Sequence, residues 1–154
     1  MLRAAGAIPL GVTNVSELCM WIESNNRVYG RTGNPYDPRR TCGGSSGGEG
    51  ALIGAGGTPF GLGADIGGSI RLPAFFNGVF GHKPSGGVVP NTGQYPLPAA
   101  GAMRYLATGP LCRRAEDLMP LLRLLAGPDD VDSACQPLAL GDPAAVALDG
   151  LPVL

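Results

Sequence analysis

Residues 43–71 read GGSSGGEGALIGAGGTPFGLGADIGGSIR, and this stretch decides the fold. The chain holds 26 glycines among its 154 residues, and twelve of them lie between positions 43 and 68. Ser45 and Ser46 stand between two glycine pairs, and Ser69 follows another pair. Glycine permits backbone torsions and close approaches that other residues resist. The pattern therefore indicates backbone loops built around the serines.

Three uses of such glycines are open to test. A phosphate loop needs a lysine after its last glycine, but the single lysine, Lys83, is followed by Pro84. The glycines at 54, 56, 61 and 63 lack the GxGxxG spacing of a dinucleotide site. A catalytic serine whose neighbouring amides bind an oxyanion fits the pattern. Each serine also fits a helix N-cap, which is the more common use of a single serine.

The flanking sequence predicts several regular elements. EGALIGAG after the first serines and IRLPAFF after Ser69 favour helices, and the AEDLMPLLRLLAG stretch predicts a helix over 115–126 that Gly127 ends. Ile8, Leu10 and Val12 alternate as in a strand. Ser16 and Glu17 can open a helix through SELCMWIES, residues 31–40 read as turns, and 151–154 read as the start of a strand.

The apolar side chains of two segments are expected to be buried. Cys19, Met20 and Trp21 suggest a core face, with a substrate contact as the alternative. The segment after Ser69 suggests a second buried face, made of Phe75, Phe76, Val79 and Phe80.

Composition excludes several classes of protein. Hydrophobic residues make up 44% and charged residues 15%, which argues against disorder despite the glycine and 15 prolines. The 11 basic and 12 acidic residues form no basic stripe, so nucleic acid is not an expected partner. Four cysteines without a CxxC pair and one histidine give no zinc pattern. We expect no metal, no cofactor, no membrane association in this stretch, and a cytoplasmic location.

GGSSGGEGALIGAGGTPFGLGADIGGSIRLPAFFNGVFGHKPS, together with TNVSELCMW, NPYDPRR and GPLCRRAEDLMPLLRLLAG, resembles the amidase signature family. Within that family, GGEGALI is most similar to the fatty-acid amide hydrolases, in particular the second type. The resemblance implies an incomplete α/β amidase signature fold, with a mixed sheet flanked by helices on both faces. Residues 1–154 would form a partial amidase domain, with a motif core at 41–102 and a helix and loop region at 103–154.

The resemblance also implies roles for particular residues. Ser69 would be the nucleophile, and Ser45, reached through a cis Gly44–Ser45 peptide, would pass protons between Ser69 and a lysine base. Backbone amides would form the oxyanion hole, and polar side chains would brace the loop and Ser46 by hydrogen bonds. The expected amides are those of Ile66, Gly67, Gly68 and Ser69, and the expected supporting residues are Ser46, Asp65 and Arg71.

The lysine base of the family lies upstream of the bridging serine, in a segment resembling GVPxxxKE. Residues 1–44 contain no lysine, and Lys83 in GHKPS matches a structural lysine of the family. His82 beside it is expected to be a surface or packing residue. Without a base, a serine hydroxyl is a weak nucleophile. The sequence is therefore interpreted as an internal fragment that is inactive by itself.

The resemblance implies hydrolysis of a small carboxylic acid amide through an acyl-enzyme, with fatty-acid amides among the candidate substrates. Two alternatives remain open. One is a catalytically inactive remnant with a structural or binding role, and the other is the subunit of an amidotransferase. No feature of the sequence fixes the oligomeric state.

Overall fold

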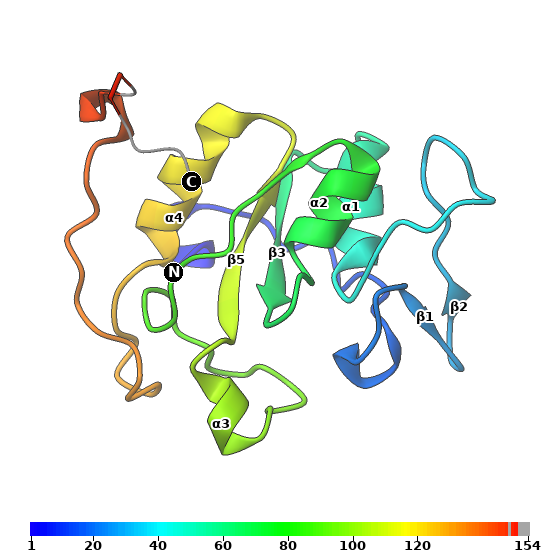
Figure 1. The fold of residues 1–154 in the computed structure, drawn as a ribbon, viewed down its shortest axis with the longest axis horizontal. Coiled ribbons are helices and arrows are strands. Elements are labelled where there is room, and N and C mark those ends of the chain that lie inside the picture. Colours follow the sequence, from blue (N-terminus) through cyan, green and yellow to red (C-terminus); the bar gives the residue numbers. More distant parts are fainter. Residues whose placement is uncertain (148, 151–154) are drawn as a thin grey trace.

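Two antiparallel strands form the centre of the fold: β3 (Phe60–Asp65) and β5 (Ala107–Cys112) (Figure 1). The computed structural model describes residues 1–147 and 149–150. Phe60 pairs with Cys112 and Asp65 with Ala107, while the short strand β4 (Phe80–Gly81) pairs with the other edge of β5. The strand order is therefore β3-β5-β4. All six residues of β5 are buried.

Helices lie on both sides of these strands. The helices α1 (Gly47–Gly54) and α2 (Arg71–Asn77) lie on one side of β3 and β5, and α4 (Leu118–Leu125) lies on the other (Figure 1). Each side has its own apolar cluster: Ile53, Ile70, Ala74 and Leu111 on the first, and Val88, Val89, Leu122 and Leu125 on the second. The α/β class with helices on both sides is confirmed. Within the described residues every strand pairing is antiparallel, so the predicted mixed sheet is not seen there.

The predicted helices after the serines form as expected. In α1 the glycines permit close packing, because a side chain at Gly50 would meet the backbone of Pro73 in α2 at about 3.1 Å. The third predicted helix divides into a 3-10 turn (Ala115–Asp117) and α4, whose Leu121, Leu122 and Leu125 are buried. Pro120 lies in the first turn of α4, where its missing N–H removes no intrahelical bond.

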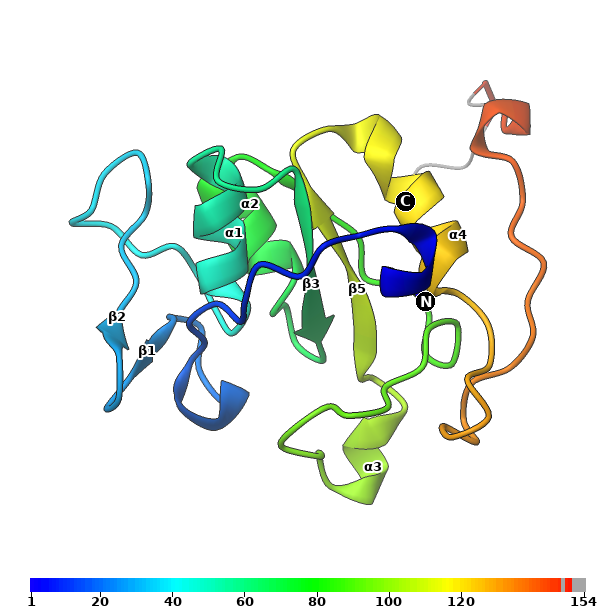
Figure 2. The same ribbon diagram turned by 180° about the vertical axis from the view of Figure 1, so that it is seen from behind.

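Two predictions for the first part of the chain are wrong. Residues 8–12 form no strand, because they have no hydrogen-bonded partner strand among the described residues, and Ile8, Leu10 and Val12 are exposed. This segment passes across β3 and β5 in the view of Figure 2. The helix predicted from Ser16 is a single 3-10 turn (Glu17–Cys19). Leu18 and Cys19 have positive φ, and the Ser16 hydroxyl contacts the carbonyls of Trp21 and Glu23 instead of capping a helix.

A small hairpin and a turn-rich loop lead from this segment to the first serines. The hairpin consists of β1 (Asn25–Asn26) and β2 (Gly30–Arg31), which pair antiparallel. The turns predicted for residues 31–40 are present, with the Asn34 side chain accepting from the amide of Tyr36.

The predicted burial of the phenylalanines is also wrong. In α2 the residues that face the core are Pro73, Ala74 and Asn77, which leaves the Phe75 side of the helix outside, with Phe75 79% exposed. Phe76 and Phe80 are exposed as well, and Val79 is partly buried.

Short elements complete the fold: the 3-10 turns Arg3–Ala5 and Pro143–Ala145, and the helix α3 (Ala100–Met103). The strand predicted for residues 151–154 lies outside the described residues. Among the described helices, none has the length and apolar character needed to cross a bilayer.

Candidate active site

Ser69 lies in the loop that joins the end of β3 to the start of α2. Asp65, the last residue of β3, is fully buried and holds this loop. Its carboxylate accepts hydrogen bonds from three backbone amides of the loop and helix, at Gly68 (2.8 Å), Ile70 (3.0 Å) and Arg71 (3.3 Å). The loop is thus folded around a carboxylate that the sequence places four residues before Ser69.

The partly exposed Arg71 side chain also binds the Asp65 carboxylate. Its guanidinium donates to both carboxylate oxygens of Asp65, at 3.1 and 3.0 Å, while the Arg71 side chain remains 55% exposed. Burial alone would raise the pKa of Asp65, but the hydrogen bonds from Arg71 and the amides outweigh it and lower that pKa below its ordinary value. Asp65 is therefore an anion at neutral pH, and its negative charge is balanced by the loop amides and the Arg71 guanidinium.

The backbone amides of the loop divide into two groups. The Gly68 amide already donates to Asp65, and Gly68 adopts φ 130°, a torsion that favours glycine. The amides of Ile66, Gly67 and Ser69 have no hydrogen-bond acceptor in the described part of the chain. Of the four amides that the resemblance assigns to an oxyanion hole, three are therefore free to donate, and the fourth, that of Gly68, is bonded to Asp65.

Ser45 lies in a second loop, just before α1. The Gly44–Ser45 peptide is cis, and Ser45 is buried. The two serine loops are joined directly, because the Ser46 amide donates to the carbonyl of Ser69 at 3.2 Å. The Ser46 hydroxyl contacts the backbone of Ala64 in β3, at 3.3 Å to its amide and 3.4 Å to its carbonyl. Ala64 therefore braces Ser46, whereas the sequence had suggested Asp65 and Arg71.

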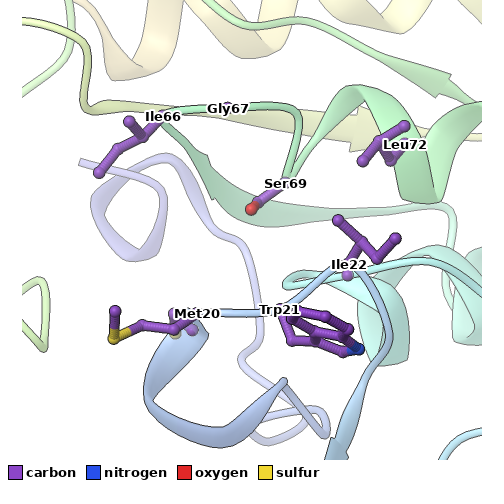
Figure 3. A pocket seen from close by; sticks show the side chains of 9 residues that line it. Met20, Trp21, Ile22, Ile66, Gly67, Ser69 and Leu72 are labelled. Atoms are coloured by element: carbon purple, nitrogen blue, oxygen red, sulfur yellow. The ribbon is translucent and has the colours of Figure 1, made fainter.

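A cavity of about 360 Å³ lies beside Ser69. Figure 3 shows the Ser69 hydroxyl pointing into the space between two apolar rims. One rim contains Ile66 and Leu72, and the other contains Met20, Trp21 and Ile22; Cys19, Gly44 and Gly67 complete the lining. Trp21 is 65% exposed, so this segment is no core face. The segment lines the cavity, and the substrate contact that the sequence left as the alternative stays a prediction.

Among the described residues, no Lys, His, Asp or Glu side chain lines this cavity. Its lining includes neither Lys83 nor His82, whose amide donates to the carbonyl of Pro110 in β5. Burial lowers the pKa of His82, so the imidazole is neutral at pH 7. In the part of the chain that the structure describes, no cluster of His, Cys, Asp or Glu side chains could hold a metal ion.

Sequence reasoning missed two contacts behind the Ser45 loop. Ser24 is fully buried and makes hydrogen bonds with Ser45 and Gly47. Glu49 in α1 accepts from the Thr13 hydroxyl at 2.7 Å. Ser24 lies outside the quoted family motifs and Glu49 lies within GGEGALI, but no motif specifies their partners, which lie 21 to 36 positions away in sequence. The glycines at 44, 47 and 48 are the only signal, since they mark where other segments come close.

The chain is similar to known proteins over most of its length. A family model described as amidase matches residues 1–150. Fatty-acid amide hydrolase 2-B of Danio rerio is 64% identical over 128 residues, which are 83% of this chain and 24% of that protein. A glutamyl-tRNA(Gln) amidotransferase subunit of Saccharolobus solfataricus is 45% identical over 132 residues, which are 86% of this chain and 27% of that protein.

A solved bacterial aryl acylamidase of the amidase signature family has a similar fold. Its TM-score is 0.78 at 34% sequence identity, over 90% of this chain and 28% of that one. The chain thus spans about a quarter of the length of the curated relatives that it matches.

Proposed function

This chain belongs to the amidase signature family, and from that premise we propose that Ser69 is the nucleophile of an amide hydrolase. The observation that carries the proposal is the position of its hydroxyl, which faces an apolar-walled cavity from a loop with three free amides. Ser69 Oγ attacks the amide carbon, and the developing oxyanion binds the amides of Ile66, Gly67 and Ser69. Removal of one such donor typically raises the barrier by about 3 to 4 kcal/mol.

Proton transfer in this proposal runs through Ser45. The Ser69 proton passes to the Ser45 hydroxyl, whose own proton goes to a base. The tetrahedral intermediate then breaks its C–N bond, and the leaving amine takes a proton back through Ser45. An acyl ester on Ser69 remains, and water hydrolyses it by the same route to give the carboxylic acid and free Ser69. The direct bond between Ser46 and Ser69 supports this pairing of the loops.

The base is the lysine that the family uses, and it comes from outside these 154 residues. Lys83 is the single lysine in the sequence, and it does not line the cavity. The chain by itself is therefore expected to be inactive. The in-frame genomic sequence before Met1 tests this point. A GVPxxxKE-like segment there supports an active complete protein, while its absence, with no complementing neighbouring gene, contradicts the enzyme and favours an inactive remnant.

The proposed substrate is an amide with an apolar acyl group, and fatty-acid amides are its leading class. Met20, Trp21, Ile22 and Leu72 offer apolar surface beside Ser69, and a relative at 64% identity is a fatty-acid amide hydrolase. Burial of each acyl CH₂ against such surface contributes about 0.8 kcal/mol. Longer acyl chains should therefore raise kcat/KM as long as the cavity accommodates them.

A series of acyl amides with increasing chain length tests this substrate class in a complete polypeptide that carries the lysine. Trp21→Ala should flatten the dependence of kcat/KM on chain length, whereas Phe75→Ala should preserve it, because Phe75 is an exposed aromatic residue that does not line the cavity. If Trp21→Ala leaves the dependence of kcat/KM on chain length unchanged, the Trp21 side of the cavity does not bind the acyl group. Release of ammonia from glutamine, with no hydrolysis of acyl amides, would instead support an amidotransferase, the second candidate that the relative at 45% identity favours.

A further inference from the structure

Ser24 lies outside every role assigned so far, immediately before β1, and it is fully buried. All of its hydrogen-bonding groups are used. Its amide donates to the carbonyl of Gly43 at 3.0 Å, and its hydroxyl donates to the carbonyl of Ser45 at 3.1 Å. The same hydroxyl accepts from the amide of Gly47 at 2.9 Å. The Ser24 carbonyl accepts from the amide of Thr32 at 2.9 Å.

Three of these four bonds go to backbone groups of alternate residues, at 43, 45 and 47, so they hold the main chain at Ser45 and on either side of it in sequence. A further bond, from the Ser46 amide to the Ser69 carbonyl, joins this loop to the loop of Ser69. The Ser45 loop is therefore fixed between Ser24 and the loop of Ser69. Gly47 leaves the space for this contact, because any side chain there would collide with the Ser24 hydroxyl.

We infer that Ser24 is a positioning residue for Ser45, which sets the place of the Ser45 hydroxyl during proton transfer with Ser69. The inference rests on the proposed function. A proton moves efficiently only when donor and acceptor lie within hydrogen-bond reach, about 2.6 to 3.2 Å. The two hydrogen bonds of the Ser24 side chain go to Ser45 and Gly47, which do not line the cavity. Its effect is therefore expected on the chemical step, with acyl binding unchanged.

The test compares two buried hydroxyls in a complete polypeptide that carries the lysine. Ser24→Ala should lower kcat and the rate at which a fluorophosphonate labels Ser69 by about 10²-fold, the size of effect that a misplacement of about 1 Å produces, while KM stays nearly constant. Thr108→Val is the matched control. Thr108 is also buried, and its hydroxyl also accepts one bond (Gln94, 2.7 Å) and donates one (Asn91, 3.0 Å), but neither partner lies in the loop of Ser45 or the loop of Ser69.

Thr108→Val should lower the melting temperature as Ser24→Ala does and keep the labelling rate. Ser24→Thr keeps the hydroxyl and should restore most of the lost rate. If Ser24→Ala does not accumulate as folded protein, Ser24→Cys serves in its place, because a thiol weakens both bonds without deleting them, and it should give an intermediate kcat.

Two results would overturn the inference alone: a Ser24→Ala variant that labels at the wild-type rate while the wild type labels Ser69, or equal losses of rate in Ser24→Ala and Thr108→Val. A folded wild type that reacts at no serine would overturn the proposed function, and the inference with it.

Discussion

The two serine loops of this protein are held in opposite ways. The loop of Ser69 is braced from within, because Asp65 bonds to the amides of Gly68, Ile70 and Arg71 and to the guanidinium of Arg71. All of these partners lie within six residues of Asp65. The loop of Ser45 is braced from outside, by Ser24 and by the carbonyl of Ser69.

The difference teaches where each half of the site gets its geometry. A loop that bonds to its own carboxylate keeps its shape with few neighbours, and its free side faces the cavity. The Ser45 loop takes its shape from the segment that also forms the cavity wall, since Trp21 and Ser24 are three residues apart. Substitutions in residues 20–24 are therefore expected to alter the position of Ser45 more than that of Ser69.

The largest expected effect comes from removing the internal brace. Asp65→Ala leaves three amides without their acceptor, and each such loss costs about 1 kcal/mol or more, so the free energy of unfolding should fall by about 3 kcal/mol or more. Arg71→Gln keeps the carboxylate and its three amide bonds, and because the Arg71 side chain is 55% exposed, it should cost only about 1 kcal/mol. Chemical denaturation measures both. Equal losses in the two variants would show that the ion pair, and not the carboxylate-amide bonds, holds the loop.

The next largest effect is the difference in stability between alanine substitutions at a glycine of each loop, Gly44 and Gly67. A side chain at Gly44 would lie 2.7 Å from the carbonyl oxygen of Trp21 and 2.8 Å from the amide nitrogen of Glu23, both backbone atoms that cannot move alone. Gly44→Ala should therefore destabilise the fold by about 1 to 3 kcal/mol. A Cβ at Gly67 in the other loop would meet no atom within 4 Å, so Gly67→Ala should change stability by about 0.5 kcal/mol or less.

Thermal unfolding measures the stability of both glycine variants relative to wild type. A Gly67→Ala variant as unstable as Gly44→Ala would contradict the view that the backbone is packed against another segment at Gly44 and faces open space at Gly67.

The smallest effect is a pH dependence with opposite signs at two carboxylates. Burial raises the pKa of Glu49 even though Thr13 and the Leu62 amide donate to it, so the folded state holds its proton more tightly than the unfolded state. The contribution of Glu49 is thus most favourable below its unfolded pKa of about 4.3 and is lost as pH rises through its folded pKa. The lowered pKa of Asp65 has the reverse effect, and its contribution is lost as pH falls below about 4 toward its folded pKa.

Glu49→Gln mimics the protonated side chain, so its stability relative to wild type should increase from pH 4 to pH 7. Asp65→Asn should be most destabilised at pH 7 and approach wild type in acid. Denaturation at a series of pH values checks both trends, and a Glu49→Gln variant that loses relative stability as pH rises would reverse the assignment for Glu49.

The same contrast explains how much the sequence could predict. The helices after each serine and the Asp65–Arg71 pair depend on residues close together in the chain, so motif spacing and helix periodicity indicate them. The roles of Ser24 and Ala64 depend on partners about 18 to 23 positions away, which no local pattern specifies. The helix predicted after Ser16 failed for a different reason, because the Ser16 hydroxyl contacts the carbonyls of Trp21 and Glu23, five and seven residues further on, instead of capping a helix.

Periodicity also misplaced the phenylalanines. The segment after Ser69 is apolar on more than one side, and the contact with α1 selects Pro73, Ala74 and Asn77 as the inner face, since the glycines of α1 admit a close neighbour there. Hydrophobicity alone therefore did not identify which side of α2 is buried.

The central claim is that Ser69 is the nucleophile, and covalent labelling tests it most directly. A fluorophosphonate, followed by mass spectrometry of the digested complete polypeptide, should modify Ser69 and no other serine, and Ser69→Ala should abolish the modification. Labelling that persists at the wild-type rate in Ser69→Ala, or that maps to Ser45 or Ser46 in the wild type, would contradict the account.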